Sequence, residues 1–582
     1  MLKKLYIGAL IAAPVLLSAA PTLANEVDRH VLLISIDGMH ALDYENCKAA
    51  GTCPNLKELG EHGVHYLRTT SSRPSDSFPG LMSIVTGGSP KTLGVYYDVA
   101  YDRVLAPPTV TTNYGVAGGT CTPGVANGTR TEYEEGIDFD YTLMNGGNST
   151  AYTITSDGKS TSPVIDGGYL AINPQMLPRD PFAQCAPVYP WNFVRANTIF
   201  GVIHQAGGYT AWADKHGVYA SVSGPTGTAT PSNVDDYYAP EINSNVVPMP
   251  GIITAAGFDC GTVSTAKPVA TTNPPYVGSV TGDWTGNWDY VTCNDQLKVN
   301  AVLNWINGRT HLSGKSAPVP TIFGMNFQSV SVGQKLIWKG IKGGYQDAQG
   351  TPTEPMKGQI EYVDAAIGQM VDALRHAHLL DSTTIIITAK HGQSPIDTNR
   401  FVEPGSSPAT VLDNYIPYSE SVNNPTGIGP TEDDISLLWL NHSSDTQAAV
   451  DALEQAQLSG AANLGLGQIF YGDSLAQLFG KPGIPVANGG TGGDPRTPDI
   501  VVAPNVGIVY TGSSKKQAEH GGFAWDDTNV MLLVSNRSLE PRTVRSFVET
   551  SQIAPTVLQI LGLDPKDLSA VRAEGTPVLP GL

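Results

Sequence analysis

Two short segments of the chain combine residue types that can make a hydroxyl group reactive. One is an apolar run, residues 31–36, that ends at Asp37; the other is a Ser-Phe-Pro turn that begins at Ser77. A serine hydroxyl is too weakly acidic to attack a substrate at pH 7 unless a base or a metal ion activates it. An aspartate at the end of a strand can hold such an ion. The two segments therefore predict a metal-activated nucleophile.

Strands and helices that alternate along the chain must bring these residues together. Apolar and β-branched runs predict strands at residues 31–36, 209–213, 320–325, 383–388 and 529–534, and helical spacing predicts helices at 49–63, 196–205, 358–379 and 553–561. This alternation predicts an α/β fold with a mainly parallel sheet covered by helices on both faces. Active residues of such sheets gather at the carboxyl ends of strands, where Asp37 and His391 stand.

The motifs resemble those of the type I phosphodiesterase/nucleotide pyrophosphatase branch of the alkaline phosphatase superfamily. The resemblance covers residues 28–100, 195–220 and 318–562. It implies an alkaline-phosphatase-like sheet sandwiched by helices, and two metal ions, usually zinc, on either side of a Ser or Thr nucleophile. It also implies that the chain hydrolyses phosphoric esters of small molecules.

Four positions carry the resemblance to the metal site of that family. Asp37 matches the ligand after the first strand, and Ser77 matches the nucleophile. His391 matches the histidine of an Asp-His-Gly motif, and His520 matches a late His-Gly. The resemblance thus implies that Asp37, His391 and His520 are metal ligands and that Ser77 is catalytic.

Three other ligand positions depart from the family pattern. Lys390 stands where Asp-His-Gly has its aspartate, and Val330 and Gln334 replace the Asp and His of an Asp-x-x-x-His segment. A site needs about three protein ligands for tight zinc binding, so one ion is favoured over two. Asp98 stands where family members often carry a substrate-binding asparagine.

Two interpretations of these departures remain open. In the first, one divalent ion, zinc by the resemblance, lies beside Ser77, and Lys390 replaces the second ion as a base or an anion clamp. In the second, Lys390 pairs with Asp37 or Asp98, and the chain is a catalytically inactive binding protein on the same fold. The retention of the nucleophile together with three ligands favours the first. A sulfate-ester hydrolase is a further alternative, although the Cys-x-Pro-x-Arg motif typical of sulfatases does not occur.

Further polar residues are candidates for substrate contacts. Lys215 and His216 follow the predicted strand 209–213 at its carboxyl end, and a solvated loop is the competing interpretation. Asp98 near the reaction centre disfavours highly charged monoesters, because a carboxylate would repel them. We therefore expect Asp98, Lys215 and His216 to bind a diester or a substrate that carries its own positive group.

The domain organisation is predicted from the rhythm of strands and helices. No linker separates two halves, so residues 25–582 are expected to form a single alkaline-phosphatase-like hydrolase domain. Residues 101–190 and 221–300 lack the rhythm and hold four of the six cysteines. We interpret these two segments as insertions.

Residues 1–24 have the features of a secretory signal peptide. Lys3 and Lys4 precede an apolar run, and Thr22-Leu23-Ala24 is typical of a cleavage site. The run is too short to span a bilayer, so we expect no stable membrane anchor and a periplasmic or secreted protein. An even number of cysteines in an exported chain favours disulfides. Pairing in sequence order (Cys47–Cys53, Cys121–Cys185 and Cys260–Cys293) closes the shortest loops, as one of several arrangements.

The net charge of −19 bears on possible partners. Loss of the signal peptide removes two lysines and no acidic residue, which makes the chain more acidic still. Such a surface disfavours nucleic acid as a partner, because phosphate neutralisation needs clustered Lys and Arg. A small-molecule ester remains the expected partner, and the sequence does not indicate an oligomeric state.

Overall fold

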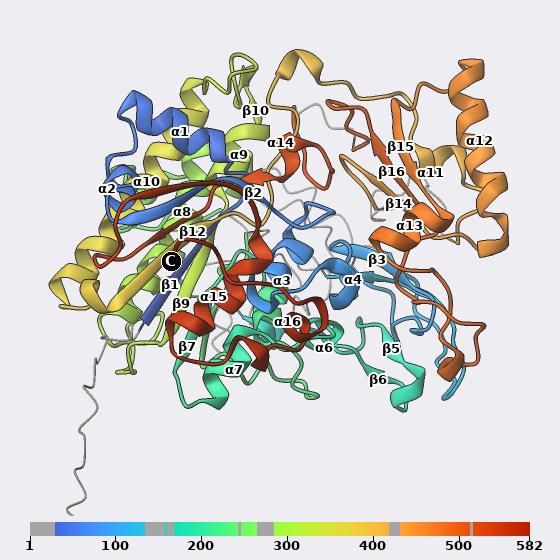
Figure 1. Cartoon of the computed structure of the whole chain (residues 1–582), viewed down its shortest axis with the longest axis horizontal. Coiled ribbons are helices and arrows are strands. Elements are labelled where there is room, and N and C mark those ends of the chain that lie inside the picture. Colours follow the sequence, from blue (N-terminus) through green and yellow to red (C-terminus); the bar gives the residue numbers. More distant parts are fainter. Residues whose placement is uncertain are drawn as a thin grey trace, which may run out of the picture.

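Apolar β-branched segments form the central sheet of the molecule, for which a computed structural model describes residues 30–113, 115–133, 158–159, 168–242, 246–264, 284–417, 431–511 and 516–582 (Figure 1). The predicted signal peptide and parts of both predicted insertions lie outside the described residues. The strands of the sheet are β1 (His30–Ile36), β2 (Gly63–Thr70), β7 (Thr210–Ala213), β8 (Asp236–Tyr238), β9 (Ile322–Phe327), β12 (Thr383–Thr388), β17 (Asn529–Val530), β18 (Leu533–Ser535) and β19 (Arg542–Glu549).

The order of the strands is β17-β2-β18-β12-β1-β9-β7-β8, with β19 paired to β2. The run from β12 to β8 is parallel, whereas β18 pairs with both neighbours in antiparallel fashion. Residues 31–34 and 36 are fully buried, because helices cover both faces of the sheet. The predicted mainly parallel α/β fold is confirmed.

Helices lie on the two faces of this sheet (Figure 1). One face carries α1 (Ala41–Ala50), α2 (Pro54–Gly60), α8 (Trp288–Ile306), α9 (Ser329–Lys335) and α10 (Glu354–His376), and the other carries α3 (Ser77–Thr86), α7 (Ile199–Gln205) and α15 (Ile553–Ile560). Helix α10 buries a stripe at helical spacing: Met356, Ile360, Val363, Ile367, Met370 and Leu374. The helix predicted within residues 49–63 is α2, which begins at Pro54 directly after Cys53.

Shorter elements connect these layers. They are α4 (Pro90–Leu93), α6 (Pro190–Phe193), α14 (Trp525–Thr528), α16 (Ser569–Glu574) and the antiparallel pairs β3 (Val99–Asp102) with β4 (Thr129–Glu132), β5 (Arg179–Asp180) with β6 (Ala186–Pro187) and β10 (Ile337–Trp338) with β11 (Ile341–Lys342). The three disulfides follow the predicted sequential pairing: Cys47–Cys53, Cys121–Cys185 and Cys260–Cys293. Within the described residues, no helix is long and apolar enough to cross a membrane.

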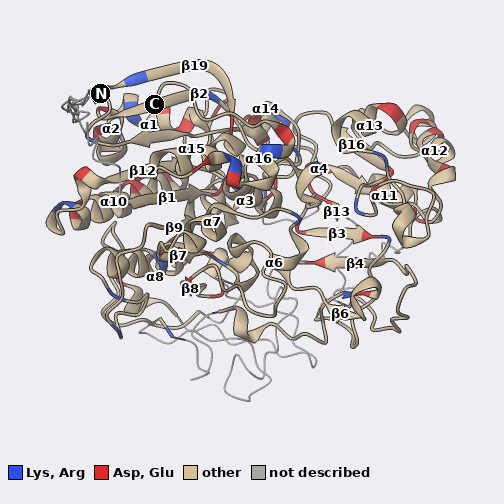
Figure 2. Cartoon of the chain, turned by 60° about the horizontal axis from the view of Figure 1, so that its bottom comes forward, with Lys and Arg blue, Asp and Glu red and all other residues tan. Residues whose placement is uncertain are grey.

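A second lobe that the sequence analysis did not single out lies beside the sheet, at the right of Figure 1. Its antiparallel sheet has the order β13 (Thr431–Glu432), β14 (Ser436–Leu438), β16 (Ile500–Pro504) and β15 (Leu466–Phe470). Helices α11 (Pro408–Val411), α12 (Thr446–Ser459) and α13 (Gly472–Leu478) belong to it, and α11 and α12 share its apolar core. Helices α12 and α13 carry acidic and no basic residues (Figure 2).

A pair of buried acids joins this lobe to the central layers. Asp434 lies between β13 and β14, Asp527 lies in α14, and the two buried carboxyl groups are close enough for each to shift the pKa of the other. Burial raises the pKa of Asp527 to about 7. Burial and the charge of Asp527 raise the pKa of Asp434 well above its usual range. Two carboxyl groups in such contact share a proton, because both cannot ionise cheaply.

We expect Asp434→Asn to weaken the pH dependence of stability. A carboxyl whose pKa is raised by folding stabilises the fold below its unfolded pKa, and this stability is lost as pH rises through the folded pKa. The asparagine amide donates to Asp527 at every pH. Between pH 5 and pH 8 the variant should therefore lose less unfolding free energy than the natural chain, by about 1–2 kcal/mol. Urea denaturation measures this difference.

The matched control is Asp451→Asn on the exposed face of α12, which should retain the natural pH dependence. Equal pH dependence in Asp434→Asn and the natural chain would show that the acid pair does not share a proton.

Candidate active site

The carboxyl ends of four parallel strands meet at one edge of the sheet. Ser35 near the end of β1 stands opposite Thr388 of β12 and Asn326 of β9, and Ala213 of β7 stands opposite Met325. The candidate residues that follow these strands are Asp37 after β1, Lys215 and His216 after β7, and Lys390 and His391 after β12; Asp214, which directly follows β7, joins them. The predicted location of the site residues at this edge agrees with the structure.

Ser77 is the first residue of α3, and its hydroxyl is buried at the amino end of that helix. Gly80, one turn further along, permits this placement: a Cβ there would lie 2.2 Å from the carbonyl oxygen of Lys390. A larger residue would push α3 away from the end of β12. The close approach brings Ser77 beside His391.

His391 is arranged to accept the proton of Ser77. Its Nδ1 lies 2.9 Å from the carbonyl oxygen of Gly392, and its Nε2 lies 3.2 Å from Ser77 Oγ. Because a carbonyl only accepts, Nδ1 carries the hydrogen, and Nε2 of the neutral ring accepts from the serine. Burial lowers the pKa of His391 to about 4, so the ring is neutral at pH 7.

Lys215 is the cation in contact with the serine hydroxyl. Its Nζ lies 3.2 Å from Ser77 Oγ and 3.2 Å from Asp37 Oδ2, and its side chain is 10% exposed. Asn326 Nδ2 also donates to Asp37 Oδ2, at 3.1 Å. Burial opposes the charged form of Lys215, but the carboxylates of Asp37 and two further acids raise its pKa. Lys215 therefore remains an ammonium ion beside the nucleophile.

Lys390 lies behind this contact in a second ion pair. Its Nζ is 3.0 and 3.1 Å from the two carboxylate oxygens of Asp214 and 3.9 Å from the centre of the Tyr219 ring. Both partners of the pair are fully buried. Burial lowers the pKa of Lys390, which Asp214 opposes. Lys215 thus occupies the place beside Ser77 that the sequence analysis assigned to Lys390.

The remaining predicted residues lie around this centre with different partners. Asp98 accepts a hydrogen bond from the backbone of Phe78 at 3.0 Å, and burial raises its pKa to about 6. His520 Nδ1 lies 3.4 Å from Asp76 Oδ1, and its ring centre is 4.1 Å from that of His391. His216 is paired with Glu241 at 2.6 Å.

The described residues do not fit the divalent-metal site that the sequence predicts. His391 Nε2 lies 3.8 Å from Asp37 Oδ2, but no group of three His, Cys, Asp or Glu side chains among the described residues is arranged to hold an ion. Asp37 Oδ2 already accepts from Lys215 and Asn326.

Two residues at the centre were not among the predicted site residues. Asn326 is the polar residue of the otherwise apolar strand β9, and that contrast is the signal that points to it. Asp76 precedes Ser77, and burial together with the carboxylate of Asp98 raises its pKa well above the usual range. No sequence pattern distinguishes Asp76 from an ordinary turn residue.

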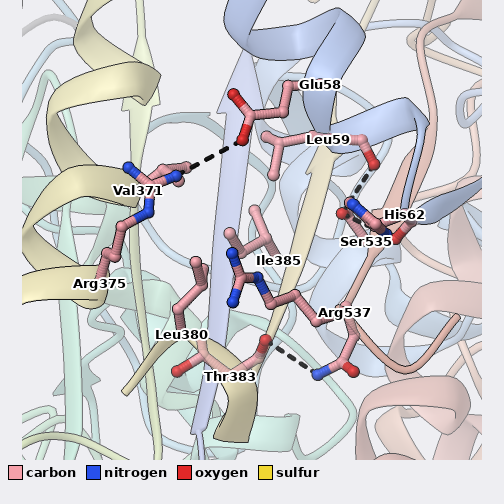
Figure 3. Close-up of a pocket in the computed structure, with 11 residues that line it drawn as sticks. Glu58, Leu59, His62, Val371, Arg375, Leu380, Thr383, Ile385, Ser535 and Arg537 are labelled. Atoms are coloured by element: carbon pink, nitrogen blue, oxygen red, sulfur yellow. Dashed lines mark hydrogen bonds and ion pairs between the residues drawn. The ribbon is translucent and has the colours of Figure 1, made fainter. Parts of the chain in front are cut away.

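A small pocket at the amino-terminal end of β12 holds none of the predicted site residues (Figure 3). Thr383, the first residue of β12, lines it together with Arg375 and Arg537. Arg375 is paired with Glu58 across the pocket, at 3.5 Å. The pocket lies at the opposite strand ends from Ser77 and is separate from the candidate site.

Comparison with known proteins finds a match to one protein family. The sequence profile described as type I phosphodiesterase/nucleotide pyrophosphatase matches residues 31–131 and 211–526, which include all the predicted site residues. No curated protein matches the sequence.

Solved structures provide matches of low identity. Murine ectonucleotide pyrophosphatase/phosphodiesterase 5 is 15% identical with a TM-score of 0.47, over 92% of this chain and 96% of that one. The human protein of the same name is 13% identical with a TM-score of 0.48, over 92% and 95%. An inactive variant of the murine protein in complex with AMP is 14% identical with a TM-score of 0.46, over 92% and 96%.

We expect Asp214→Asn to destabilise the protein strongly. The change leaves the Lys390 ammonium buried without a counter-charge, which costs about 3–5 kcal/mol of unfolding free energy. Adding Lys390→Met should recover much of the loss, because no unpaired charge then remains. Urea denaturation followed by circular dichroism gives both values.

Glu58→Gln, which breaks the exposed pair with Arg375, serves as the control and should cost less than about 1 kcal/mol. An Asp214→Asn variant as stable as this control would mean that the buried pair does not hold the site together.

Proposed function

Because the chain belongs to the type I phosphodiesterase/nucleotide pyrophosphatase family of the alkaline phosphatase superfamily, and is therefore a phosphoric ester hydrolase, we propose that Ser77 attacks the phosphorus of its substrate. The observation that carries the proposal is the pair of contacts at Ser77 Oγ, with a neutral histidine on one side and an ammonium ion on the other. The substrate is a small-molecule phosphoric ester.

In the first step the hydroxyl proton of Ser77 moves to His391 Nε2 while Oγ forms a bond to phosphorus. The bond from phosphorus to the leaving oxygen breaks, and the protonated His391 returns the proton to the departing alcohol. In the second step His391 takes a proton from water as the water oxygen bonds to phosphorus. The bond from phosphorus to Ser77 Oγ breaks, and His391 returns the proton to Ser77 Oγ. Gly392, through its carbonyl oxygen, keeps His391 in the required tautomer throughout.

Electrostatic stabilisation comes from groups that are fixed before the substrate arrives. Lys215 lies beside the attacking oxygen, and the amino end of α3 directs its positive dipole end to the same place. The family is in general dependent on divalent metal ions, but the residues described here do not fit one. No step of the proposed mechanism therefore passes through a metal ion.

A non-catalytic binding protein is the alternative that a specific observation favours. Lys390 forms a fully buried ion pair with Asp214, as expected if the former metal site had become a salt-bridged core. Lys215 is not enclosed in the same way: its side chain is 10% exposed, and its ammonium contacts the nucleophile. The hydrolase proposal therefore rests on Lys215 in the role first assigned to Lys390.

We further propose that residues 1–24 direct export and that residues 25–582 act as one hydrolase, to which the second lobe belongs. Three disulfides support an oxidising compartment, the periplasm or the medium. Mass spectrometry of the exported protein tests this: the expected product begins at Asn25, and an uncleaved amino terminus contradicts the signal peptide.

Ser77→Ala should abolish hydrolysis of phosphoric esters, with a loss of at least about a thousandfold in kcat, because no other group replaces the nucleophile. The fold should remain intact, since the change removes one oxygen atom. A steady-state assay with bis(4-nitrophenyl) phosphate, together with circular dichroism, measures both.

Ser75→Ala is a matched control two residues away. Ser75 Oγ contacts the carbonyl oxygen of Asp527 at 2.6 Å and Ser71 Oγ at 2.7 Å, so its loss should lower stability but preserve turnover. Natural activity in Ser77→Ala would refute the proposed nucleophile.

A further inference from the structure

Two lysine–aspartate pairs alternate in charge at the carboxyl edge of the sheet. Lys215 contacts Asp37, and Lys390 contacts Asp214, which directly precedes Lys215 in the chain. All four residues are buried, so water screens their interactions weakly. The only one with appreciable side-chain exposure is Lys215, which is also the one that touches Ser77 Oγ.

A nucleophilic oxygen that attacks phosphorus needs a positive charge beside it, which an ammonium ion or a metal ion can supply. The two are mutually exclusive at this position. A metal ion requires several lone-pair donors, whereas an ammonium ion has hydrogens only and no acceptor. Any ion placed against Asp37 and Ser77 would lie against the Lys215 ammonium, which repels it.

Asp37 accepts its two hydrogen bonds at Oδ2, and its Oδ1 has no hydrogen-bond partner among the described residues, whereas both oxygens of Asp214 are engaged. Both carboxylate oxygens of Asp214 accept from Lys390 Nζ, and Oδ2 also accepts from Trp212 Nε1 at 2.9 Å. At the positions where the resemblance places two more ligands, Val330 is apolar and Gln334 is bonded to Gln393 by two contacts, at 3.1 and 3.2 Å. Asp214, Val330 and Gln334 therefore add no donor for a divalent ion beside Ser77, and Asp37 lies against the Lys215 ammonium.

From these contacts we propose that the Lys215 ammonium takes the place of the divalent cation, so that the enzyme hydrolyses singly charged phosphoric diesters without a metal ion. The inference rests on the proposed function and specifies its cofactor requirement and substrate class. Lys215 is a catalytic residue in this scheme, because it contacts the attacking oxygen. Lys390 is a positioning residue, which holds Asp214 beside the Lys215 backbone.

The charges around Ser77 support a diester as substrate. Two lysines are balanced by Asp37 and Asp214, and Asp98 adds a further acid next to α3. A monoester would bring two negative charges into a site with no surplus of positive charge. A diester brings one, which the Lys215 ammonium beside Ser77 Oγ can meet.

The first test measures metal content and metal dependence in the full-length natural protein. After dialysis against EDTA and then metal-free buffer, elemental analysis should find no stoichiometric zinc, manganese, magnesium or calcium. Hydrolysis of bis(4-nitrophenyl) phosphate should stay within twofold of the undialysed protein and should exceed hydrolysis of 4-nitrophenyl phosphate. One equivalent of tightly bound metal that Asp37→Asn removes, or activity that EDTA abolishes and zinc restores, would overturn the inference.

The second test removes the Lys215 ammonium and asks whether a zinc ion then binds in its place. Lys215→Ala should lower kcat for the diester at least a hundredfold and free Asp37, Ser77 and His391 for a metal ion. Calorimetric titration with zinc should then detect binding in Lys215→Ala but not in the natural protein. Stoichiometric zinc binding by the natural protein that Asp37→Asn removes, or natural turnover in Lys215→Ala, would contradict the role of the ammonium.

Two further variants keep the result interpretable. Asp37→Asn with Lys215→Met leaves no unpaired buried charge, so it should fold even if Lys215→Ala does not, and it should show the same loss of rate. Lys342→Met, at an exposed position of β11, should behave as the natural protein. Full activity of Ser77→Ala would refute the proposed nucleophile alone, whereas a requirement for zinc would refute only the metal-free inference.

Discussion

The contact between the Lys215 ammonium and the Asp37 carboxylate is the interaction on which the rest of the site depends. A buried carboxylate or ammonium without a partner costs several kcal/mol, so each member of the pair requires the other. The same holds for Lys390 and Asp214, and the two pairs are linked because Asp214 and Lys215 are neighbours in the chain. The ends of β1, β7 and β12 are therefore linked by these two ion pairs as well as by the backbone hydrogen bonds of the sheet.

This arrangement determines the chemistry available to Ser77. Burial, together with the ammonium ions of Lys215 and Lys335, lowers the pKa of His391, so the histidine remains a neutral acceptor. Helix α3 can reach this position because Gly80 lets it pack against the backbone of Lys390. A base, a fixed cation and a helix amino terminus thus converge on one oxygen atom, and they do so from three separate elements.

The second lobe contributes to the site through its junction with the central sheet. The backbone of Asp434 donates to the carbonyl of His520 at 3.2 Å, and Tyr97 from the segment between α4 and β3 contacts Asp433 of the lobe. An apolar cluster that includes Tyr96, Leu437 and Trp439 seals the same junction. The position of His520 beside His391 is therefore a product of both halves of the molecule.

Local patterns in the sequence determined the architecture. Apolar runs such as residues 31–36 and 383–388 predicted central strands, and helical spacing predicted α10, because these features depend on neighbours along the chain. The sequential disulfide pairing was one of several arrangements that the sequence allowed, and the structure selects it. The second lobe was not predicted, because several of its strands, such as β13 with two residues, are too short to show an alternation of apolar and polar residues. The sequence also placed Ser77, His391 and both lysines at one edge of the sheet.

Only the tertiary structure decided which lysine meets the nucleophile. Lys215 and Lys390 both follow parallel strands of the same sheet, so their positions in the sequence are equivalent. Asp214 accepts Lys390 and thereby leaves Lys215 to bridge Asp37 and Ser77. That choice depends on the directions of buried side chains from three strands, and on the cost of leaving any of their charges unpaired, neither of which a linear pattern contains.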